Sequence, residues 1–191
     1  MNCKLGLALI ALVACPTMAA AQSTEDGTVA VEGSVRPVCI LGEPLPTLVD
    51  LGQLSAGSGV RAGRIAAIPP QTVVLPVSYC NFSGSMVSVS ATALTTSDAT
   101  APVDGFTRAV NYTASASGWA DSSSSATTAA QGDGTSPTAN GSGAAQPLPQ
   151  VADITLTLSD FTTPQDQLLV AGNYSGNVIV TLGPAIAAGD N

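Results

Sequence analysis

The sequence contains no histidine, and its charged and aromatic residues are scarce, at 9% and 4% of the chain. Without histidine, a Ser-His-Asp or Cys-His nucleophile is excluded, and so is any metal site that needs imidazole. The aspartates that could pair for glycoside hydrolysis have no neighbouring feature that would raise a pKa. We therefore expect no enzyme, no catalytic residue, no metal site and no cofactor.

Basic residues are also rare. Lysine occurs once, as Lys4, and the other positive charges are Arg36, Arg61, Arg64 and Arg108, against 13 acidic residues. So few cations cannot neutralise a phosphate backbone, which excludes nucleic acid as a main partner. In a secreted protein, a strong negative charge indicates solubility.

The one long apolar run is at the N-terminus. Residues 5–15 are apolar after a single lysine, a proline follows, and small alanines precede residue 22. This is the pattern of a secretory signal peptide over residues 1–21, with cleavage between Ala21 and Gln22. The run is too short for a permanent membrane-spanning helix.

Cysteine is limited to four residues, of which Cys3 and Cys15 lie in the signal peptide. The stretch LVAC ending at Cys15 resembles a lipoprotein cleavage box, and its use would lipidate Cys15 and anchor the protein to a membrane. Cys39 and Cys80 remain in the mature chain, where an oxidising compartment favours a disulfide between them. Two free thiols or a zinc site are the alternatives, but two cysteines without histidine half-fill a zinc shell.

The mature chain shows period-2 patterns of small, apolar and hydroxyl residues. Residues 27–39, GTVAVEGSVRPVC, alternate as a strand with one buried face does. Residues 86–94, MVSVSATAL, place valines and alanines on one face. After the signal peptide no stretch has convincing helical periodicity, so strand spacing and turn signals predict an all-β sandwich. Seven strands are expected, at residues 28–38, 48–54, 72–79, 86–94, 106–116, 152–160 and 176–183.

Two of these strands carry sharper expectations. Pro76 lies inside a strand pattern, which predicts an edge position or a β-bulge. In the strand at 106–116, we expect Phe106, Val110 and Tyr112 to point inward.

Residues 114–146 consist almost entirely of alanine, serine, threonine and glycine, with Trp119 as the one large apolar residue. Such a segment buries too little apolar surface to offset its ordering entropy. It is predicted to be a long mobile hairpin loop or a weakly ordered β-hairpin, with Trp119 anchoring its base.

Several segments, in order along the chain, resemble the chaperone–usher pilus subunits (pilins), and among them the spore coat protein U-like branch. GTVAVEGSVRPVC resembles the N-terminal extension and first strand of a pilin, and Cys39 and Cys80 match the positions of the family's disulfide. The other matching segments are LVDLGQL (48–54), NYTASASGWADS (111–122) and AGNYSGNVIVTL (171–182). The match spans most of residues 27–184, with a long insert and a short tail as departures.

The resemblance implies a non-enzymatic subunit of a surface fimbria that supports cell adhesion or biofilm formation. Its fold would be an immunoglobulin-like, pilin-type antiparallel β-sandwich over residues 34–184 that lacks its own last edge strand, followed by a flexible tail at 185–191. Residues 22–33 would be an N-terminal extension that donates a strand to the neighbouring subunit. The expected partners are like subunits, a periplasmic chaperone and an outer-membrane usher, and the expected location is the cell surface.

In the donated strand, Val29 and Val31 would fill pockets of the neighbour, and Gly27 or Gly33 would allow close backbone approach. From the residue pattern alone, residues 28–35 could equally pair within their own sheet. The alternative function is a self-contained secreted or lipid-anchored β-sandwich that binds a cell-surface ligand.

Overall fold

The computed structural model describes residues 25–97 and 104–185, and it divides the chain after Val35 into two units. The units are described separately below, and residues 36–185 are called the domain. The predicted signal peptide, with Cys15 and the cleavage site at Ala21 and Gln22, lies outside the described residues. So does most of the predicted tail.

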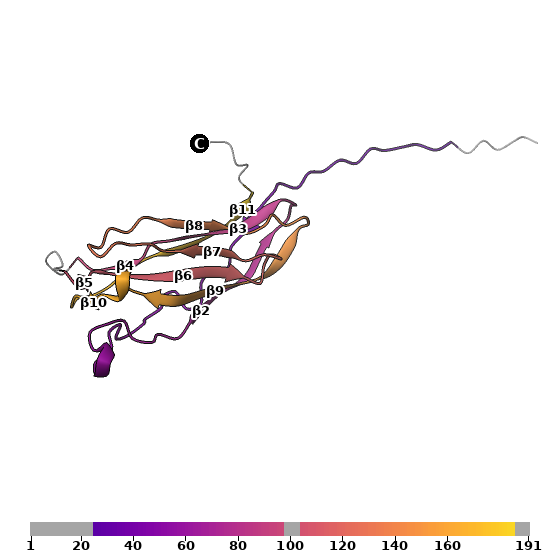
Figure 1. The fold of residues 1–191 in the computed structure, drawn as a ribbon. Coiled ribbons are helices and arrows are strands. Elements are labelled where there is room, and N and C mark those ends of the chain that lie inside the picture. The colour runs from indigo at the N-terminus through magenta and orange to yellow at the C-terminus, as the bar shows by residue number, and fades with distance from the viewer. Residues whose placement is uncertain (1–24, 98–103, 186–191) are drawn as a thin grey trace, which may run out of the picture. The chain divides into compact units, whose positions relative to one another are not determined.

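The domain is all-β, as predicted, with two short 3-10 turns (Figure 1). No helix in the described ranges is long and apolar enough to cross a membrane. The strands are β1 (Cys39–Ile40), β2 (Gln71–Cys80), β3 (Ser85–Ala91), β4 (Leu94–Thr95), β5 (Phe106–Thr107), β6 (Ala109–Ser117), β7 (Ser124–Thr127), β8 (Ala139–Ser142), β9 (Gln150–Thr162), β10 (Leu168–Leu169) and β11 (Val178–Pro184). The 3-10 turns are η1 (Gly59–Arg61) and η2 (Pro164–Asp166).

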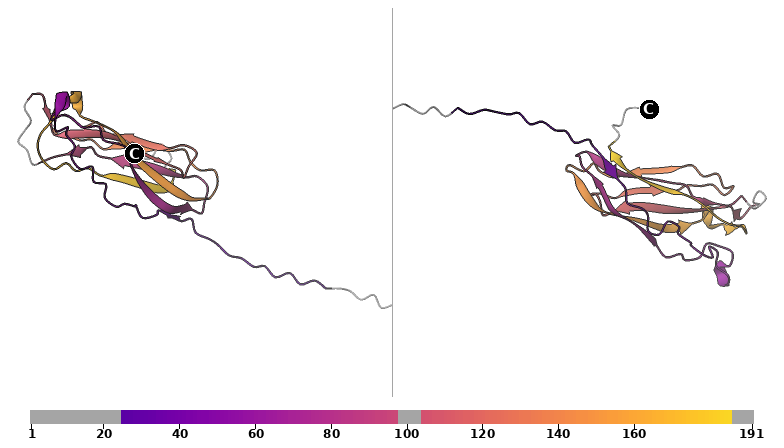
Figure 2. Two further views of the ribbon diagram at one scale, coloured as in Figure 1. Left: turned by 90° about the horizontal axis from the view of Figure 1, so that it is seen from below. Right: turned by 180° about the vertical axis from the view of Figure 1, so that it is seen from behind.

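The strands form two main antiparallel sheets. In the larger one, the order is β1-β2-β9-β6, and both β4 and β7 pair with the outer side of β6. The smaller sheet has the order β11-β3-β8. The short strands β5 and β10 form a separate parallel pair. Figure 2 shows the same strands from below and from behind.

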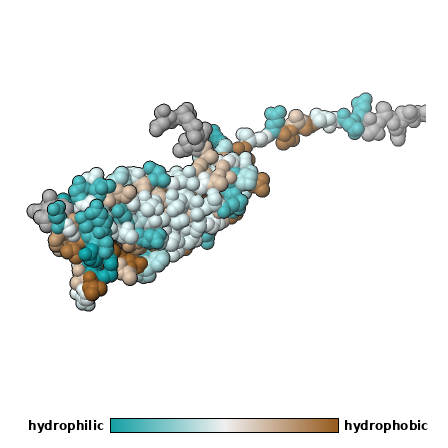
Figure 3. Space-filling view, in the orientation of Figure 1, coloured by the Kyte–Doolittle hydropathy of each residue, from teal (hydrophilic) through white to brown (hydrophobic). Residues whose placement is uncertain are grey.

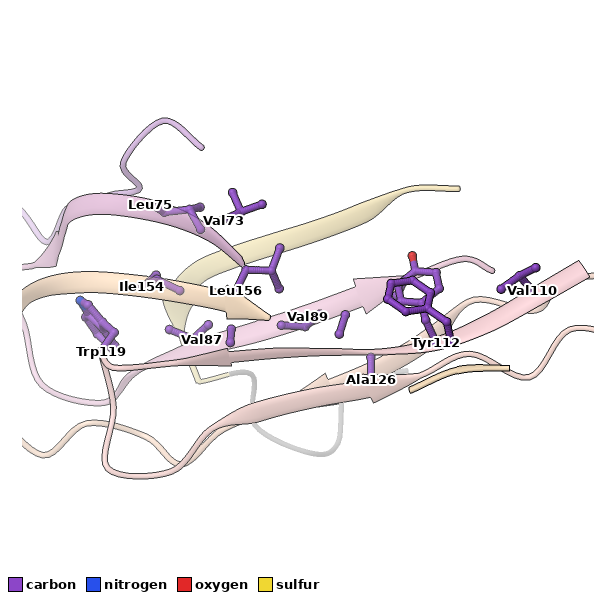
Figure 4. Packing of buried hydrophobic residues seen from close by; sticks show 14 of the residues in the cluster. Val73, Leu75, Val87, Val89, Val110, Tyr112, Trp119, Ala126, Ile154 and Leu156 are labelled. Atoms are coloured by element: carbon purple, nitrogen blue, oxygen red, sulfur yellow. The ribbon is translucent and has the colours of Figure 1, made fainter. Parts of the chain in front are cut away.

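The hydrophobic core combines inward side chains from both sheets (Figure 4). From β3 come Val87, Val89 and Ala91, the face that the sequence predicts to be buried. Opposite them lie residues of the larger sheet, including Leu75 and Ile154. β3 therefore contributes alternate residues to the core, as the period-2 pattern requires.

The predicted disulfide between Cys39 and Cys80 is present. The two cysteines stand directly opposite each other in the β1–β2 pair, with their Cα atoms 4.2 Å apart. Asn81 fixes the same corner: its Oδ1 accepts the N–H of Val38 at 2.7 Å, and its Nδ2 donates to the carbonyl of Arg36 at 2.9 Å. Asn81 N also donates to Val38 O at 3.1 Å, so one covalent bond and three hydrogen bonds tie the start of the domain to the end of β2.

Pro76 produces a β-bulge, one of its two predicted outcomes. The β2–β9 register shifts between Leu75 and Ser78, and Val77 takes a positive φ of 50°. The N–H of Val77 leaves the ladder and donates to Asp153 Oδ1 at 2.8 Å. The extra residue turns Val77 outward and Ser78 inward, so the alternation of buried side chains along β2 changes its phase at the bulge.

Two of the seven predicted strands are wrong. Residues 28–38 and 48–54 form no strand, although both have suitable patterns. An alternating pattern specifies which side chains would share a face, but a strand also needs a neighbour that satisfies its backbone groups. Near the second segment, Leu45 makes one bridge to Val74, and Pro46, which has no N–H, follows it.

The expectation for the strand at 106–116 is correct at Val110 and Tyr112, which are buried, and wrong at Phe106, which is 38% exposed. The chain bends at Arg108, between β5 and β6. Because the bend breaks the alternation, Thr107 is buried instead of Phe106.

The alanine- and serine-rich insert also differs from its prediction as one loop or hairpin. It supplies the end of β6, then β7, which pairs with β6, and β8, which pairs with β3 in the other sheet. Trp119 is buried at the start of this stretch, as predicted, and its Nε1 donates to the carbonyl of Ser78 at 3.0 Å. The insert therefore extends both sheets.

Candidate functional site

The C-terminal strand β11 is the edge of its sheet: within the described ranges it pairs with β3 alone. Hydrogen bonds from Thr92 N to Asn177 O and from Ala185 N to Gly84 O, both 2.9 Å, bracket this pairing. Backbone groups alternate in direction along an antiparallel strand. The N–H and C=O groups of Val178, Val180 and Leu182 therefore point away from β3, toward the edge.

The same three residues direct their side chains toward the other sheet. They pack against the core but stay only partly buried, while Val87 and Val89 on the adjacent strand are almost completely buried. β11 thus presents a row of backbone donors and acceptors together with incompletely covered apolar side chains. An edge of this kind is a template for a further strand.

A cavity of about 320 Å³ lies beside β11. One wall is Val178 and Val180, and the other is the segment from Leu41 to Leu51. Its floor consists of core residues of the larger sheet and of β4. These floor residues are Val73, Leu75, Leu94, Tyr112, Leu156, Leu158 and Phe161.

A second cavity, of about 620 Å³, continues the first one. The two cavities share Leu48, Val49, Leu51 and Leu94, and the second is bounded further on by residues 169–174. We call the two together the edge groove. It runs beside β11 and continues past the N-terminal end of that strand.

The wall opposite β11 has few backbone bonds. Leu45 exchanges two backbone hydrogen bonds with Val74, at 2.8 and 3.0 Å, and Ala66 N donates to Leu54 O at 2.8 Å. Between these two anchors, Gly52 N donates locally to Asp50 Oδ1 at 2.8 Å. Residues 46–53 therefore flank the groove without joining a sheet.

Tyr112 joins the floor of the groove to the start of β11. Its hydroxyl donates to Thr92 O at 2.8 Å and lies 3.5 Å from Asn177 O, and its ring stacks on Phe161 with centroids 5.9 Å apart. Burial raises the pKa of Tyr112 to about 12. The hydroxyl is therefore a neutral donor at ordinary pH, and it binds Thr92, whose N–H donates to Asn177 O directly before β11.

The residues predicted to form the donated strand lie in the N-terminal segment, residues 25–35, which forms no strand. Val29 and Val31 are 83% and 91% exposed, and Figure 3 shows hydrophobic residues (brown) at intervals along this segment. Neither Gly27 nor Gly33 has the positive φ that favours glycine. The segment carries its apolar side chains without burying them.

In the described part of the chain, no three His, Cys, Asp or Glu side chains form a group that could hold a metal ion. The strongest ionic cluster is Asp166 with two arginines: Arg61 Nη2 lies 2.8 Å from Oδ1, and Arg64 Nη1 lies 3.2 Å from Oδ2. The hydrogen bond from Arg61 holds the pKa of Asp166 below its usual value.

The residues that line the edge groove were not predicted from the sequence. The alternation Val178-Ile179-Val180-Thr181-Leu182 predicts which side chains face inward, but no residue pattern states which strand lies at an edge. That information depends on pairings between segments far apart in the chain, such as β11 with β3.

Comparison of the chain with known protein families, with curated proteins and with solved structures gave no significant match.

Proposed function

We propose that the chain is a structural subunit of a surface fimbria, with an incomplete immunoglobulin-like, pilin-type sandwich that a strand from the next subunit completes. The observation that carries the proposal is the edge of β11, where Val178, Val180 and Leu182 present backbone groups outward beside an apolar groove. Binding of an extended segment to such an edge is β-strand addition, with backbone hydrogen bonds for affinity and pockets for selectivity.

The N-terminal extension has the properties of the missing strand. It is long enough, and Gly27, Val29, Val31 and Gly33 share one face of an extended chain. Val29 and Val31 would then enter the apolar groove while their backbone pairs with β11. Each valine that becomes fully buried would add about 1.5–3 kcal/mol to binding.

The chain enters the domain at one end of the edge groove, and this placement supports a head-to-tail polymer. The chain enters the domain at Arg36, beside Asn81 and β1, and β1 contacts β11 (Figure 2). A donor that runs antiparallel to β11 would leave the groove at the opposite end, near Val178. Each copy would then follow the last in one direction, which is the arrangement that produces open filaments.

The proposal places the subunit in the export pathway to the cell surface. A lone domain with this edge would be prone to aggregation, so a periplasmic chaperone would cover β11 before assembly, and an outer-membrane usher would exchange it for the next subunit. The finished fibre would support adhesion or biofilm formation.

Deletion of residues 22–32 tests the donor role. The truncated subunit should fold with its disulfide intact but should not join fibres, because its own edge groove can still accept a strand while it has none to give. The measurement is the ladder of detergent-resistant, heat-labile polymers on a gel. Ladders from the truncated subunit alone would contradict the proposal.

A matched pair of variants tests the face of the donor. Val29→Arg with Val31→Arg should abolish the polymer ladder, because charged side chains cannot enter the apolar groove. Thr28→Arg with Ala30→Arg adds the same charge to the other face and should leave ladders visible. Equal loss in both variants would show that charge or folding, and not the valine face, controls assembly.

The alternative, a self-contained β-sandwich that binds a cell-surface ligand, predicts a different behaviour. Such a protein would refold alone to a soluble monomer and would stay monomeric with an intact N-terminal extension. Size-exclusion chromatography of the refolded chain separates the two functions.

A further inference from the structure

Two of the four arginines of the domain lie close together. Arg61 and Arg64 lie on the loop between the groove wall at residues 41–55 and β2, and both bind Asp166 of η2. Figure 3 shows a hydrophilic surface (teal) over the end of the domain that carries β5 and β10 in Figure 1. Two guanidinium groups against one carboxylate leave a net positive charge.

The arginine cluster adjoins the end of the edge groove. The groove wall at 48–55 continues into this loop, where Ala56 N donates to Arg64 O at 2.9 Å. On the other side, Leu169, which also bounds the groove, donates its N–H to Gly63 O at 2.8 Å. Both walls of the second cavity are therefore joined to the loop that carries the cluster.

Both arginines can bind a further acidic group. Their side chains are 50% and 37% exposed, and a guanidinium has five N–H donors. Arg61 uses some of them on Asp166 and on Ile65 O, and Arg64 uses Nη1 on Asp166. The backbone at Gln165 and Asp166 takes positive φ values of 52° and 53°, which places the Asp166 carbonyl and carboxylate together against the arginines.

The N-terminal segment has the opposite charge. Residues 25–35 contain Glu25, Asp26 and Glu32 and no basic residue. A donor that runs antiparallel to β11 brings its C-terminal half to the end of the groove near Val178, which is the end with the cluster. Glu32 is the acidic residue of that half, while Glu25 and Asp26 would lie toward β1.

We propose that Arg61 and Arg64 bind Glu32 of a second copy of this chain, and that this contact fixes the direction and register of the donated strand. The inference rests on the proposed function, because it assumes that the extension occupies the edge groove. It adds a polar contact beyond the apolar groove. In the opposite direction, Glu32 would lie away from the cluster and the contact would be lost.

Peptide binding tests the contact on the full chain. The acceptor is the full chain with Val29→Arg and Val31→Arg, which cannot donate, and the probe is a synthetic peptide of residues 22–33. At about 20 mM salt, Glu32→Arg in the peptide should weaken binding about 3- to 10-fold, as expected for loss and reversal of exposed ion pairs. Asp26→Arg is the matched control, because Asp26 shares the face of Glu32 in an extended chain, and it should change binding less than about 2-fold.

The acceptor side gives a reciprocal test. In the acceptor, Arg61→Glu with Arg64→Glu should weaken binding of the wild-type peptide by a similar factor. The same acceptor should bind the Glu32→Arg peptide to within about 2-fold of the affinity between the unchanged acceptor and the wild-type peptide. Because this double variant could disturb the loop, Asp166→Asn provides a second acceptor variant, which should bind the wild-type peptide more tightly. All differences should shrink at about 300 mM salt, where the Debye length is shorter.

The outcomes separate the two proposals. If the wild-type peptide binds but Glu32→Arg and Asp26→Arg weaken its binding equally, the contact with the cluster is wrong and the groove proposal stands. If no peptide binds to any acceptor at either salt concentration, the proposed function and this inference are both overturned.

Discussion

The edge where β7 and β8 lie and the edge where β1 and β11 lie both end the same two sheets, but the structure completes them differently. At the first, Ser124 Oγ donates to Gly141 O at 2.9 Å and Ala144 N donates to Ser122 Oγ at 2.6 Å, so the two sheets meet through their outer strands. At the second, a groove of apolar residues separates β11 from the opposite wall.

The difference shows how residue size controls an edge. A Cβ on Gly141 would lie 1.9 Å from Ser125 O, so glycine allows β8 to approach β7 directly. Around the other edge, Val178 and Val180 of β11 line the cavity. Small residues let the strands of one edge approach closely, and larger branched residues line the open groove at the other.

Loss of the disulfide should have the largest effect, and it should loosen the groove edge first. The bond between Cys39 and Cys80 spans a separation of 41 residues, so its removal should lower the free energy of unfolding by about 4 kcal/mol. Urea unfolding of Cys39→Ala with Cys80→Ala checks this value. A change below about 1 kcal/mol would show that the disulfide does not lower the conformational entropy of the denatured chain by the expected amount.

Substitution of one glycine on each outer strand of the smaller sheet compares how closely the two edges are packed. Gly141→Ala on β8 should lower the free energy of unfolding by about 1–3 kcal/mol, because its neighbour is backbone and cannot rotate away. Gly183→Ala on β11 is the control, since nothing lies within 4 Å of its added Cβ. That variant should be neutral or more stable by about 0.5–1 kcal/mol. Similar losses at both positions would contradict the comparison.

Proline tests which backbone groups of β11 are already paired. Thr181→Pro removes an N–H that faces β3, and the orphaned partner carbonyl should cost about 1–3 kcal/mol. Val180→Pro removes an N–H that faces the groove, and it should lower stability much less while blocking polymer formation. Thermal unfolding measures stability, and the polymer ladder measures assembly. If Val180→Pro destabilises the fold more than Thr181→Pro, the N–H of Val180 is paired in the monomer, and the assignment of the free edge of β11 is wrong.

The smallest effect concerns Tyr112 on the groove floor. Its pKa is raised from 10.0 to about 12, so the folded state keeps its proton where the unfolded state loses it. The stabilisation is complete below pH 10 and is lost as the pH rises from 10 to 12. Tyr112→Phe should make stability less dependent on pH in that range, which unfolding curves at increasing pH would measure. An unchanged dependence would assign the pH effect to other groups.

The sequence predicted most strands whose inward face contrasts clearly with the outward face. β3, β9 and β11 fall close to the ranges expected from the patterns at 86–94, 152–160 and 176–183. The strands β7 and β8 were missed because serine, alanine and threonine differ too little in hydropathy to show a face. Their order depends on contacts with β6 and β3 that are distant in sequence.

The opposite error occurred at residues 28–38, where a clear alternation forms no strand. The pattern predicts a face correctly only if a partner strand exists, and a single chain does not state where that partner lies. The disulfide, by contrast, could be predicted because two cysteines follow the predicted signal peptide, so each has one possible partner.

Amide hydrogen exchange along β11 tests the central claim most directly. In the monomeric full chain with Val29→Arg and Val31→Arg, the amides of Val178, Val180 and Leu182 should exchange much faster than those of Ile179 and Thr181, which face β3. Addition of the peptide of residues 22–33 should protect the three edge amides. If they are already protected without peptide, or if saturating peptide leaves them unprotected, β11 is not the edge that receives the N-terminal strand.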